Sequence, residues 1–165
     1  MLPDYVVAID PGTTESGVCV VRTSDYGPVH FVKIGNANVG AWVFERIQCP
    51  YRLVIEMVAS YGMPVGKEVF ETCVWIGRFI EQLEVPGVGH EFVYRQEEKL
   101  CLCHSTKAND ATIRRALADR FAYGQPNYGK GTKKEKGWFY GFAADTWSAY
   151  AVAVTAIDRD RETGK

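Results

Sequence analysis

The chain has 165 residues, of which 47% are hydrophobic and 24% are charged, and its formal net charge is −1 at pH 7. This length and composition are typical of one globular domain with a real core. No apolar run is long enough to cross a membrane, and the N-terminus lacks the basic start and apolar stretch of a signal peptide, so we expect a cytoplasmic protein without a membrane anchor.

The first half of the chain is predicted to be mainly β-structure. Residues 5–10 form a short apolar run that ends in Asp-Pro-Gly-Thr-Thr, which is typical of a strand followed by a turn. Strands are also expected at residues 17–22 and 29–34, and the short connections between the three predict an antiparallel meander. Helical spacing of apolar residues predicts a helix over 39–48, and residues 52–58 are apolar on both sides, like a central strand.

The second half alternates predicted helices with a further strand. Apolar residues repeat at intervals of three and four over residues 65–83, which predicts a helix. A fifth strand is expected at residues 91–95. Asn109 or Asp110 can cap a helix that runs to about Phe121, with apolar residues on one face.

The last part of the chain combines a loop with a helix. Residues 122–137 are rich in Gly, Lys and Tyr and have no apolar period, which predicts a mobile loop, whereas residues 142–157 return to helical spacing with one small-residue face. The order of elements predicts an α/β fold: a five-stranded mixed sheet, three antiparallel strands and then two parallel ones, with helices on both faces. We expect a single domain over residues 1–158 and a polar tail over 159–165.

Three carboxylates stand at unusual places in this pattern. Asp10 ends the first strand, and Glu56 interrupts the apolar run Leu-Val-Ile-Glu-Met-Val of the central strand. A carboxylate buried in a sheet is costly unless it is paired or binds a cation. Asp145 lies on the last helix among alanines, which allow the helix to approach the sheet closely. Three convergent acids predict a site for Mg²⁺ or Mn²⁺, and two such ions about 4 Å apart can activate water for phosphodiester cleavage.

A purely structural interpretation of the three acids remains open. In it, Asp10 caps the turn before Gly12, Glu56 pairs with a nearby Lys or Arg, and Asp145 is the N-cap of its helix. Each acid alone fits this interpretation as well as the other. The occurrence of all three at such junctions favours the metal site.

Positive charge is concentrated in residues 99–136, which contain nine Lys and Arg against three acids, a local balance of +6 that leaves −7 for the remainder. Such a distribution suits a protein that binds a polyanion on one face and a metal on another, although a solvated basic loop is an equally simple explanation. Aromatic residues among the lysines can stack on unpaired bases. The expected DNA-binding residues of this region are Arg114, Lys130, Lys133, Lys134 and Lys136, with Tyr123, Tyr128 and Trp138 between or beside the lysines.

Each of the three acids lies in a short motif: residues 9–17, Ile-Asp-Pro-Gly-Thr-Thr-Glu-Ser-Gly, then Val54-Ile55-Glu56, then Ala143-Ala144-Asp145. These motifs resemble those of the RuvC-like Holliday-junction resolvases, which have an RNase H-like fold. The first two resemble the family's first and second motifs, and the third resembles the helix that carries the family's last acid. The resemblance extends from about residue 5 to residue 157, and residues 105–121 look like bacteriophage-encoded members of the group.

The resemblance implies a Mg²⁺- or Mn²⁺-dependent endonuclease, with two ions per active site, that resolves four-way DNA junctions as a homodimer whose twofold symmetry matches the junction. Asp10, Glu56 and Asp145 would be its catalytic metal ligands. Lys107 matches a family lysine near the scissile phosphate. Tyr61 would insert at the junction centre, although packing in the core or at an interface explains this tyrosine equally well. For a phage member, the expected location is the bacterial host cytoplasm.

The sequence departs from the family pattern at two places. The family often has a further acid or a histidine one helical turn before the last acid, and Phe142 occupies that position here. A fourth ligand is then missing or replaced by water; Asp110 is a possible substitute, but its position fits a helix cap better. The long basic loop from Tyr123 to Lys136 suggests a different grip on the substrate, and relatives of this kind process broader branched DNA.

Other functions are compatible with parts of the sequence. The Asp-Pro-Gly-Thr-Thr turn also resembles the phosphate-binding turn of actin-like ATPases, which need a second lobe around the nucleotide. A catalytically silent nucleic-acid-binding module with the same fold is the other alternative. The odd number of scattered cysteines argues against a disulfide framework, and the Cys-x-Cys-His spacing of residues 101–104 is a poor zinc motif.

Overall fold

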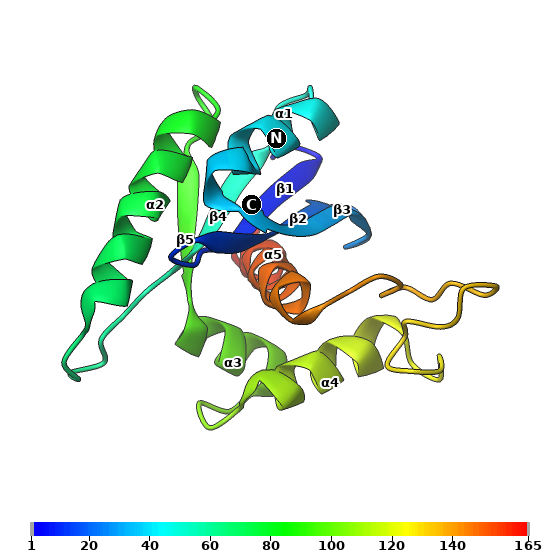
Figure 1. Ribbon diagram of the computed structural model, residues 1–165. Coiled ribbons are helices and arrows are strands. Elements are labelled where there is room, and N and C mark those ends of the chain that lie inside the picture. The colour runs from blue at the N-terminus through cyan, green and yellow to red at the C-terminus, as the bar shows by residue number, and fades with distance from the viewer. Residues whose placement is uncertain (1, 165) are drawn as a thin grey trace.

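The computed structural model describes residues 2–164 and contains one five-stranded mixed sheet with the strand order β3-β2-β1-β4-β5 (Figure 1). The first three strands pair antiparallel, β4 lies parallel to β1, and β5 lies parallel to β4. The predicted sheet is therefore confirmed, and every predicted strand is present to within two residues. The strands are β1 (Tyr5–Asp10), β2 (Glu15–Arg22), β3 (Pro28–Gly35), β4 (Arg52–Met57) and β5 (His90–Tyr94).

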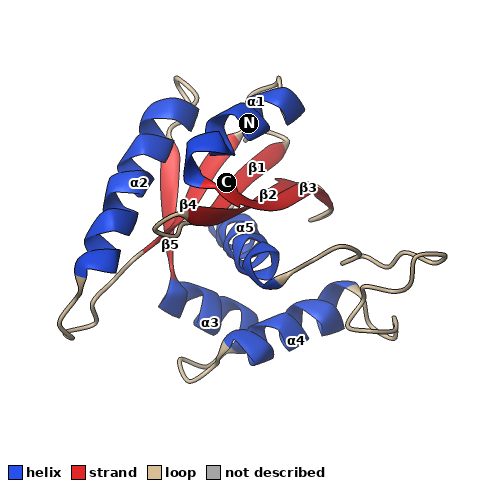
Figure 2. Ribbon diagram, in the orientation of Figure 1, coloured by secondary structure: helices blue, strands red, loops and turns tan. Residues whose placement is uncertain are grey.

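Helices cover both faces of the sheet, as predicted (Figure 2). Helices α1 and α2 pack on one face, while α5 crosses the other face with α3 and α4 beside it. Among the described residues, none of the helices combines the length and the apolar character that crossing a bilayer would require. The helices are α1 (Val39–Arg46), α2 (Lys67–Leu83), α3 (Arg95–Cys103), α4 (Asp110–Phe121) and α5 (Ala144–Thr163), with a short 3₁₀ turn η1 (Asn36–Asn38) before α1.

Alternation along the strands creates two cores, one on each side of the sheet. Val7 and Ile9 of β1 face α1 and α2, whereas Val6 and Ala8 face α5. The face of α5 toward the sheet is made of small residues, as the sequence predicts, so its backbone lies close to β1 and β2. Its fully buried members include Ala149, Val152, Ala153 and Ala156.

Two segments differ from the sequence-based prediction. Residues 95–103 form α3, which no apolar period in the sequence predicts, because most of its side chains are polar and only Glu98 is fully buried. Helix α5 starts at Ala144 and continues to Thr163, so the boundary expected at residues 158/159 lies inside a helix.

The basic segment between α4 and α5 contains no helix or strand, but hydrogen bonds fold it into a series of turns. Thr132 N–H donates to the Glu135 carbonyl at 2.8 Å, and Phe139 N–H donates to the Gly129 carbonyl at 2.9 Å. Trp138 anchors the segment to the domain: its ring stacks on Phe121, with centroids 5.6 Å apart and planes 7° apart. The segment is thus tied to the core at its second half.

Candidate active site

The carboxyl ends of β1 and β4 bring two acids side by side. The strands are parallel neighbours, with Ile9 opposite Ile55, so Asp10 and Glu56 follow at the same edge of the sheet. Their carboxyl groups lie within hydrogen-bonding reach of each other. Asp10, the last residue of β1, and Glu56, the penultimate residue of β4, therefore form a pair on adjacent parallel strands.

Hydrogen bonds from other side chains hold the turn after Asp10. Gly12 N–H donates to Ser16 Oγ at 3.2 Å, and the Ser16 hydroxyl donates to Asn36 Oδ1 at 2.6 Å. Asn36 Nδ2 in turn donates to the Gly12 carbonyl at 2.9 Å. Ser16 and Asn36 therefore stabilise the turn, and the Asp10 carboxylate faces Glu56. The interpretation of Asp10 as the cap of this turn is not supported.

Helix α5 brings the third acid to the same edge. Asp145 lies in the first turn of α5, and the N-cap is Ala143, so Asp145 is not the N-cap. Gly17 of β2, directly opposite Asp10, leaves room for the backbone of Asp145. The Asp145 Oδ2 atom lies 2.8 Å from Lys33 Nζ, and the charge of Asp145 contributes to raising the pKa of Asp10. The three acids predicted from the sequence therefore converge.

Burial and the charges of neighbouring acids raise the pKa values of both Asp10 and Glu56. Burial, followed by the charge of Glu56, raises the pKa of Asp10 to about 8. Burial, followed by the charge of Glu98, raises the pKa of Glu56 to about 7. Arg95 opposes both shifts without cancelling them. Carboxyls with such environments are characteristic of sites that bind cations or transfer protons.

A fourth acid, Glu98 of α3, belongs to the site and was missed by the sequence analysis. Its side chain is fully buried, and Oε2 accepts a 2.7 Å hydrogen bond from Arg95. Its Oε1 has no hydrogen-bond partner within residues 2–164. Burial raises the pKa of Glu98 to about 7, and the charge of Asp10 adds to the shift. Finding Glu98 from the sequence would have required recognition of α3.

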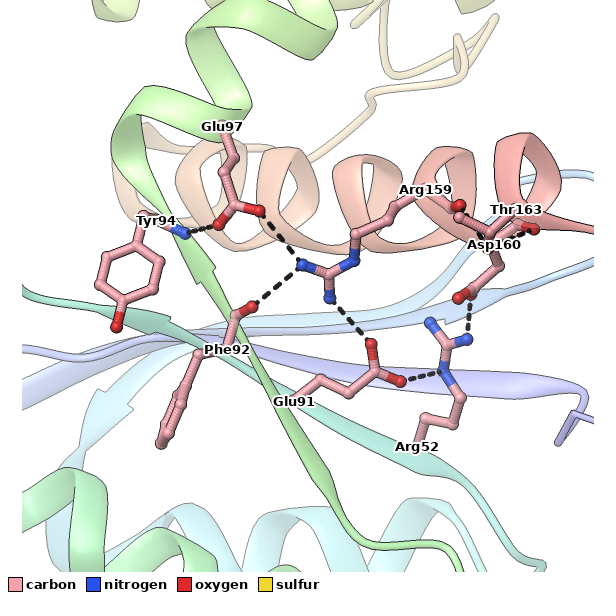
Figure 3. Close-up of polar contacts among 8 residues, drawn as sticks. All are labelled: Arg52, Glu91, Phe92, Tyr94, Glu97, Arg159, Asp160 and Thr163. Carbon is pink, nitrogen blue, oxygen red and sulfur yellow. Dashed lines mark hydrogen bonds and ion pairs between the residues drawn. The ribbon is translucent and has the colours of Figure 1, made fainter. Parts of the chain in front are cut away.

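A network behind the site fixes the start of α3 (Figure 3). Glu97 accepts a 2.7 Å hydrogen bond from the Tyr94 N–H and pairs at 3.2 Å with Arg159 of α5. Arg159 also pairs with Glu91 of β5 at 2.8 Å. Because Glu97 is locked from two sides, the neighbouring Glu98 is held at a fixed position against the sheet.

A small cleft of about 100 Å³ opens beside Asp145 between α4 and α5. Arg95, Asp110 and Arg114 contribute to its lining. Arg95 pairs with both Glu98 and Asp110. The Arg114 Nε atom is buried and has no hydrogen-bond partner in the described chain. The cleft thus places two guanidinium groups beside Asp145, and that of Arg114 has an Nε–H donor without a partner.

Of the two residues predicted as caps of α4, Asn109 is confirmed and Asp110, which the sequence favours as a cap over a ligand, is not the cap. Asn109 is the cap: its Oδ1 accepts from Thr112 N–H at 3.0 Å, and Thr112 Oγ1 accepts from the Asn109 N–H at 2.8 Å. The side chain of Asp110 is 80% exposed and extends toward Arg95 instead.

Phe142, at the position where the family often has a ligand, belongs to the core. It is 2% exposed, and its ring lies 4.6 Å from that of Phe31 and 5.1 Å from that of Trp147, centroid to centroid. In the family pattern this position lies on the last helix, one turn before the last acid. Phe142 instead precedes α5, which begins at Ala144. An acid at this position would be buried among aromatic rings, so the substitution by Phe is a packing feature.

Two other predicted site residues, Lys107 and Tyr61, do not line the cleft beside Asp145. Lys107 is exposed in the connection between α3 and α4 and does not line the cleft. Tyr61 is 54% exposed in a left-handed backbone conformation, and its hydroxyl accepts a 3.4 Å hydrogen bond from the Gln96 N–H. Of the predicted DNA-binding residues, only Arg114 lines the cleft beside Asp145.

The predicted DNA-binding lysines of the basic segment between α4 and α5 differ in their exposure to solvent. Lys133, Lys134 and Lys136 are exposed, whereas Lys130 is half-buried. Tyr123 and Tyr128 are 86% and 56% exposed and free to stack on a ligand. Trp138 is not, because Phe121 covers its ring and its Nε1–H donates to Tyr150 Oη at 3.2 Å.

The donor set fits a hard divalent cation in its chemistry. All four acids supply oxygen, three have raised pKa values, and one oxygen of Glu98 is buried without a partner. Within the described residues, no group of three or more His, Cys, Asp or Glu side chains is arranged to hold a metal ion as it stands. Asp145 faces Lys33 instead, so full coordination requires side-chain movement.

The fold matches that of known structures, although the sequence does not match known families. No protein-family model matches the chain, and no curated protein matches it either. Thermus thermophilus RuvC in complex with a Holliday junction substrate superposes with a TM-score of 0.67 at 16% identity, over 96% of this chain and 97% of that one. A second structure of Thermus thermophilus RuvC gives a TM-score of 0.63 at 18% identity, over 97% and 96% of the two chains. The chain therefore has a RuvC-like fold of the RNase H-like type.

Proposed function

We propose that the protein is a metal-dependent, structure-selective DNA endonuclease that hydrolyses phosphodiesters in Holliday junctions or other branched DNA. The observation that carries the proposal is the convergence of Asp10, Glu56 and Asp145 at one edge of a RuvC-like sheet. A fold by itself does not define an activity, whereas these acids supply the chemistry that phosphodiester hydrolysis needs. Uncompensated, half-buried carboxyls destabilise a protein, which favours a functional reason for their presence.

The three acids would hold Mg²⁺ or Mn²⁺, with two ions as the expected number. Such ions, when bound, supply activation of water and stabilisation of the leaving oxygen. Glu98 adds negative charge behind Glu56, and Arg95 keeps Glu98 in place through its 2.7 Å hydrogen bond. Lys107 is proposed to approach the scissile phosphate from the connection before α4, on the resemblance to the family alone.

The cleft beside Asp145 supports binding of a DNA phosphate next to the acids. Arg114 has an unsatisfied Nε there, and a phosphate oxygen is a suitable acceptor for it. The exposed lysines between α4 and α5 would extend this contact along the backbone and make affinity depend on salt. The proposed DNA-binding residues of that segment are Lys130, Lys133, Lys134 and Lys136, with Tyr61 at the junction centre.

A homodimer is part of the proposal, since two active sites are needed to cut two opposed strands of a four-way junction. Exposed apolar side chains on α2 support it: Phe70 is 62% exposed and Val74, one turn later, is 59% exposed. A second copy of the chain would cover such a face. Sedimentation of the wild type beside Phe70→Glu tests this part, and a monomeric wild type would contradict it.

The test of the activity is cleavage of labelled four-way junction, flap, single-stranded and duplex DNA with Mg²⁺, Mn²⁺ or EDTA. The wild type is compared with Asp145→Asn. Paired symmetric nicks in the junction, lost in EDTA and in the variant, are the expected result. Cuts in flaps as well would indicate a broader debranching nuclease, and the resemblance to phage-encoded relatives makes that breadth plausible.

The alternative is a catalytically silent module that binds branched DNA through the same basic surface. It predicts tight junction binding and no cleavage with either metal. The half-buried pair of Asp10 and Glu56 argues against this alternative. A protein without catalytic activity would be more stable if these two acids were replaced by uncharged residues.

A further inference from the structure

Lys33 lies between two acids at the edge of the candidate active site. Its Nζ is 2.8 Å from Asp145 Oδ2 and 3.5 Å from Glu15 Oε2. One of these acids belongs to the proposed metal site, whereas Glu15 is the first residue of β2 and lies outside it. A single ammonium group is thus shared between an acid of the site and an acid beside it.

The sheet register fixes this arrangement. Asp10 is opposite Gly17, and Gly17 is opposite Lys33, so the three residues form one row across β1, β2 and β3. The first turn of α5 sits over the glycine in the middle of the row, where a Cβ would come within 2.3 Å of the Asp145 carbonyl oxygen. Asp10 lies at one end of this row, on β1, and Lys33 lies at the other end, on β3. Lys33 therefore contacts Asp145 from the β3 side of the glycine.

Lys33 can exchange one carboxylate partner for the other, because both of its ion pairs are exposed to solvent. Its side chain is 49% exposed, and those of Asp145 and Glu15 are 36% and 55% exposed. An ion pair at that exposure is weak, and an ammonium group has no fixed bonding direction, so it can move between two carboxylates at little cost. A divalent cation at Asp145 would repel the ammonium group, and Glu15 is within reach to receive it.

We propose that Lys33 is an internal cation that competes with a divalent cation for Asp145 and transfers to Glu15 when that cation binds. Lys33 is thus a positioning residue that sets the metal affinity of the site. This inference rests on the proposed function only in assuming that Asp145 is a metal ligand. It assigns a role to Lys33, which lies outside the motifs of the sequence, and to Glu15, which lies within the first motif but has no role assigned there.

The experiment measures Mn²⁺ binding by calorimetry and by the electron paramagnetic resonance of free Mn²⁺, without DNA. Removing the competitor in Lys33→Met should tighten the dissociation constant about 3- to 10-fold. The matched control is Lys67→Met, which removes a lysine that pairs with Glu71 at 3.2 Å on α2. The control should leave Mn²⁺ affinity unchanged.

Glu15→Gln separates a transfer of Lys33 from a simple effect of distant charge. Without Glu15 the lysine has only Asp145 as a partner, so Mn²⁺ binding should weaken about 2- to 3-fold. In the Lys33→Met background the same change should have no effect, which makes the double-mutant cycle non-additive. Circular dichroism of each variant confirms that the fold is retained.

The outcomes separate this inference from the proposed function. Equal weakening by Glu15→Gln in both backgrounds, or unchanged affinity in Lys33→Met, would overturn the role of Lys33 and leave metal binding intact. Absence of Mn²⁺ binding in the wild type and in every variant would overturn both the inference and the metal dependence of the proposed enzyme.

Discussion

The carbonyl oxygen of Asp145 lies directly against Gly17, so close that a Cβ on the glycine would be 2.3 Å from it. Real atoms do not approach in this way, and the obstacle is backbone rather than a flexible side chain. The first turn of α5 can therefore take its position only because residue 17 of β2 is a glycine without a side chain. The same glycine thus determines where Asp145, the third acid of the site, lies.

Gly17→Ala should displace the start of α5. We expect a loss of about 1–3 kcal/mol in the free energy of unfolding, because overpacking at a rigid contact is destabilising. Junction cleavage by the folded protein should fall at least about tenfold, since small displacements of catalytic groups are costly. Urea unfolding and cleavage rates measure the two effects. Gly77→Ala on α2, where a Cβ meets nothing within 4 Å, is the control.

The stability of the protein in EDTA should decrease as the pH rises from about 5 to 8. Asp10 and Glu56 have pKa values of about 8 and 7 in the folded chain, above their values in the unfolded chain. The folded state thus binds more protons, and the stabilisation, complete below pH 4, is lost as the pH rises through the folded-state values. We expect a fall of about 2–4 kcal/mol in the free energy of unfolding.

Asp10→Asn provides the control for this pH dependence. The variant should remove the largest single contribution to the slope and be more stable than the wild type at pH 8, while being inactive in cleavage. Stability that is constant or increases over the same range in the wild type would contradict the environment described for the two acids.

Arg114 and Arg115 are a matched pair for testing the cleft. Arg114 lines it beside Asp145, whereas Arg115 is 70% exposed and pairs with Asp119 at 3.6 Å. Arg114→Ala should weaken four-way junction binding about 3- to 10-fold, and Arg115→Ala less than twofold. Binding in EDTA, followed by fluorescence anisotropy, measures both. Equal losses would indicate a diffuse electrostatic surface instead of a local phosphate contact.

The buried ion pair between Arg52 and Asp160 fastens β4 to α5 (Figure 3). Arg52→Met should lower the free energy of unfolding by about 3–5 kcal/mol, because it leaves the Asp160 carboxylate buried without its partner. Replacing both residues, as in Arg52→Met with Asp160→Leu, should recover most of the loss. Chemical unfolding of both variants measures the effect, and a double variant as unstable as the single one would show that the pair stabilises by more than mutual neutralisation.

The strands and most helices could be predicted because their apolar periods are strong and turn residues separate them. Asp10 and Glu56 stood out for the same reason, as acids inside otherwise apolar runs. Asp145 was recognised through the small residues of α5. These expectations needed only local patterns and the rule that parallel strands end at the same edge of a sheet.

Glu98 could not be recognised in this way. Helix α3 reads Arg-Gln-Glu-Glu-Lys at its start, where several acids are alike and only the tertiary fold determines which of them is buried. The pairing of Lys33 with Asp145 also escaped, because it joins β3 to α5 across a glycine and no sequence spacing records it. The sequence allows either Asn109 or Asp110 to cap α4, because the two residues are neighbours and both types favour that position; only the structure shows that Asn109 is the cap.

Helix α5 contributes both to the candidate site and to one of the two hydrophobic cores. It carries Asp145, which is 135 positions away from Asp10 in the chain, and it also supplies the small-residue face that closes one core of the sheet. A nascent chain on the ribosome that has not yet released α5 therefore has neither a finished core nor three acids at one edge. If the acids act as proposed, a chain in which α5 has not packed on the sheet lacks Asp145 at the site and cannot cut DNA.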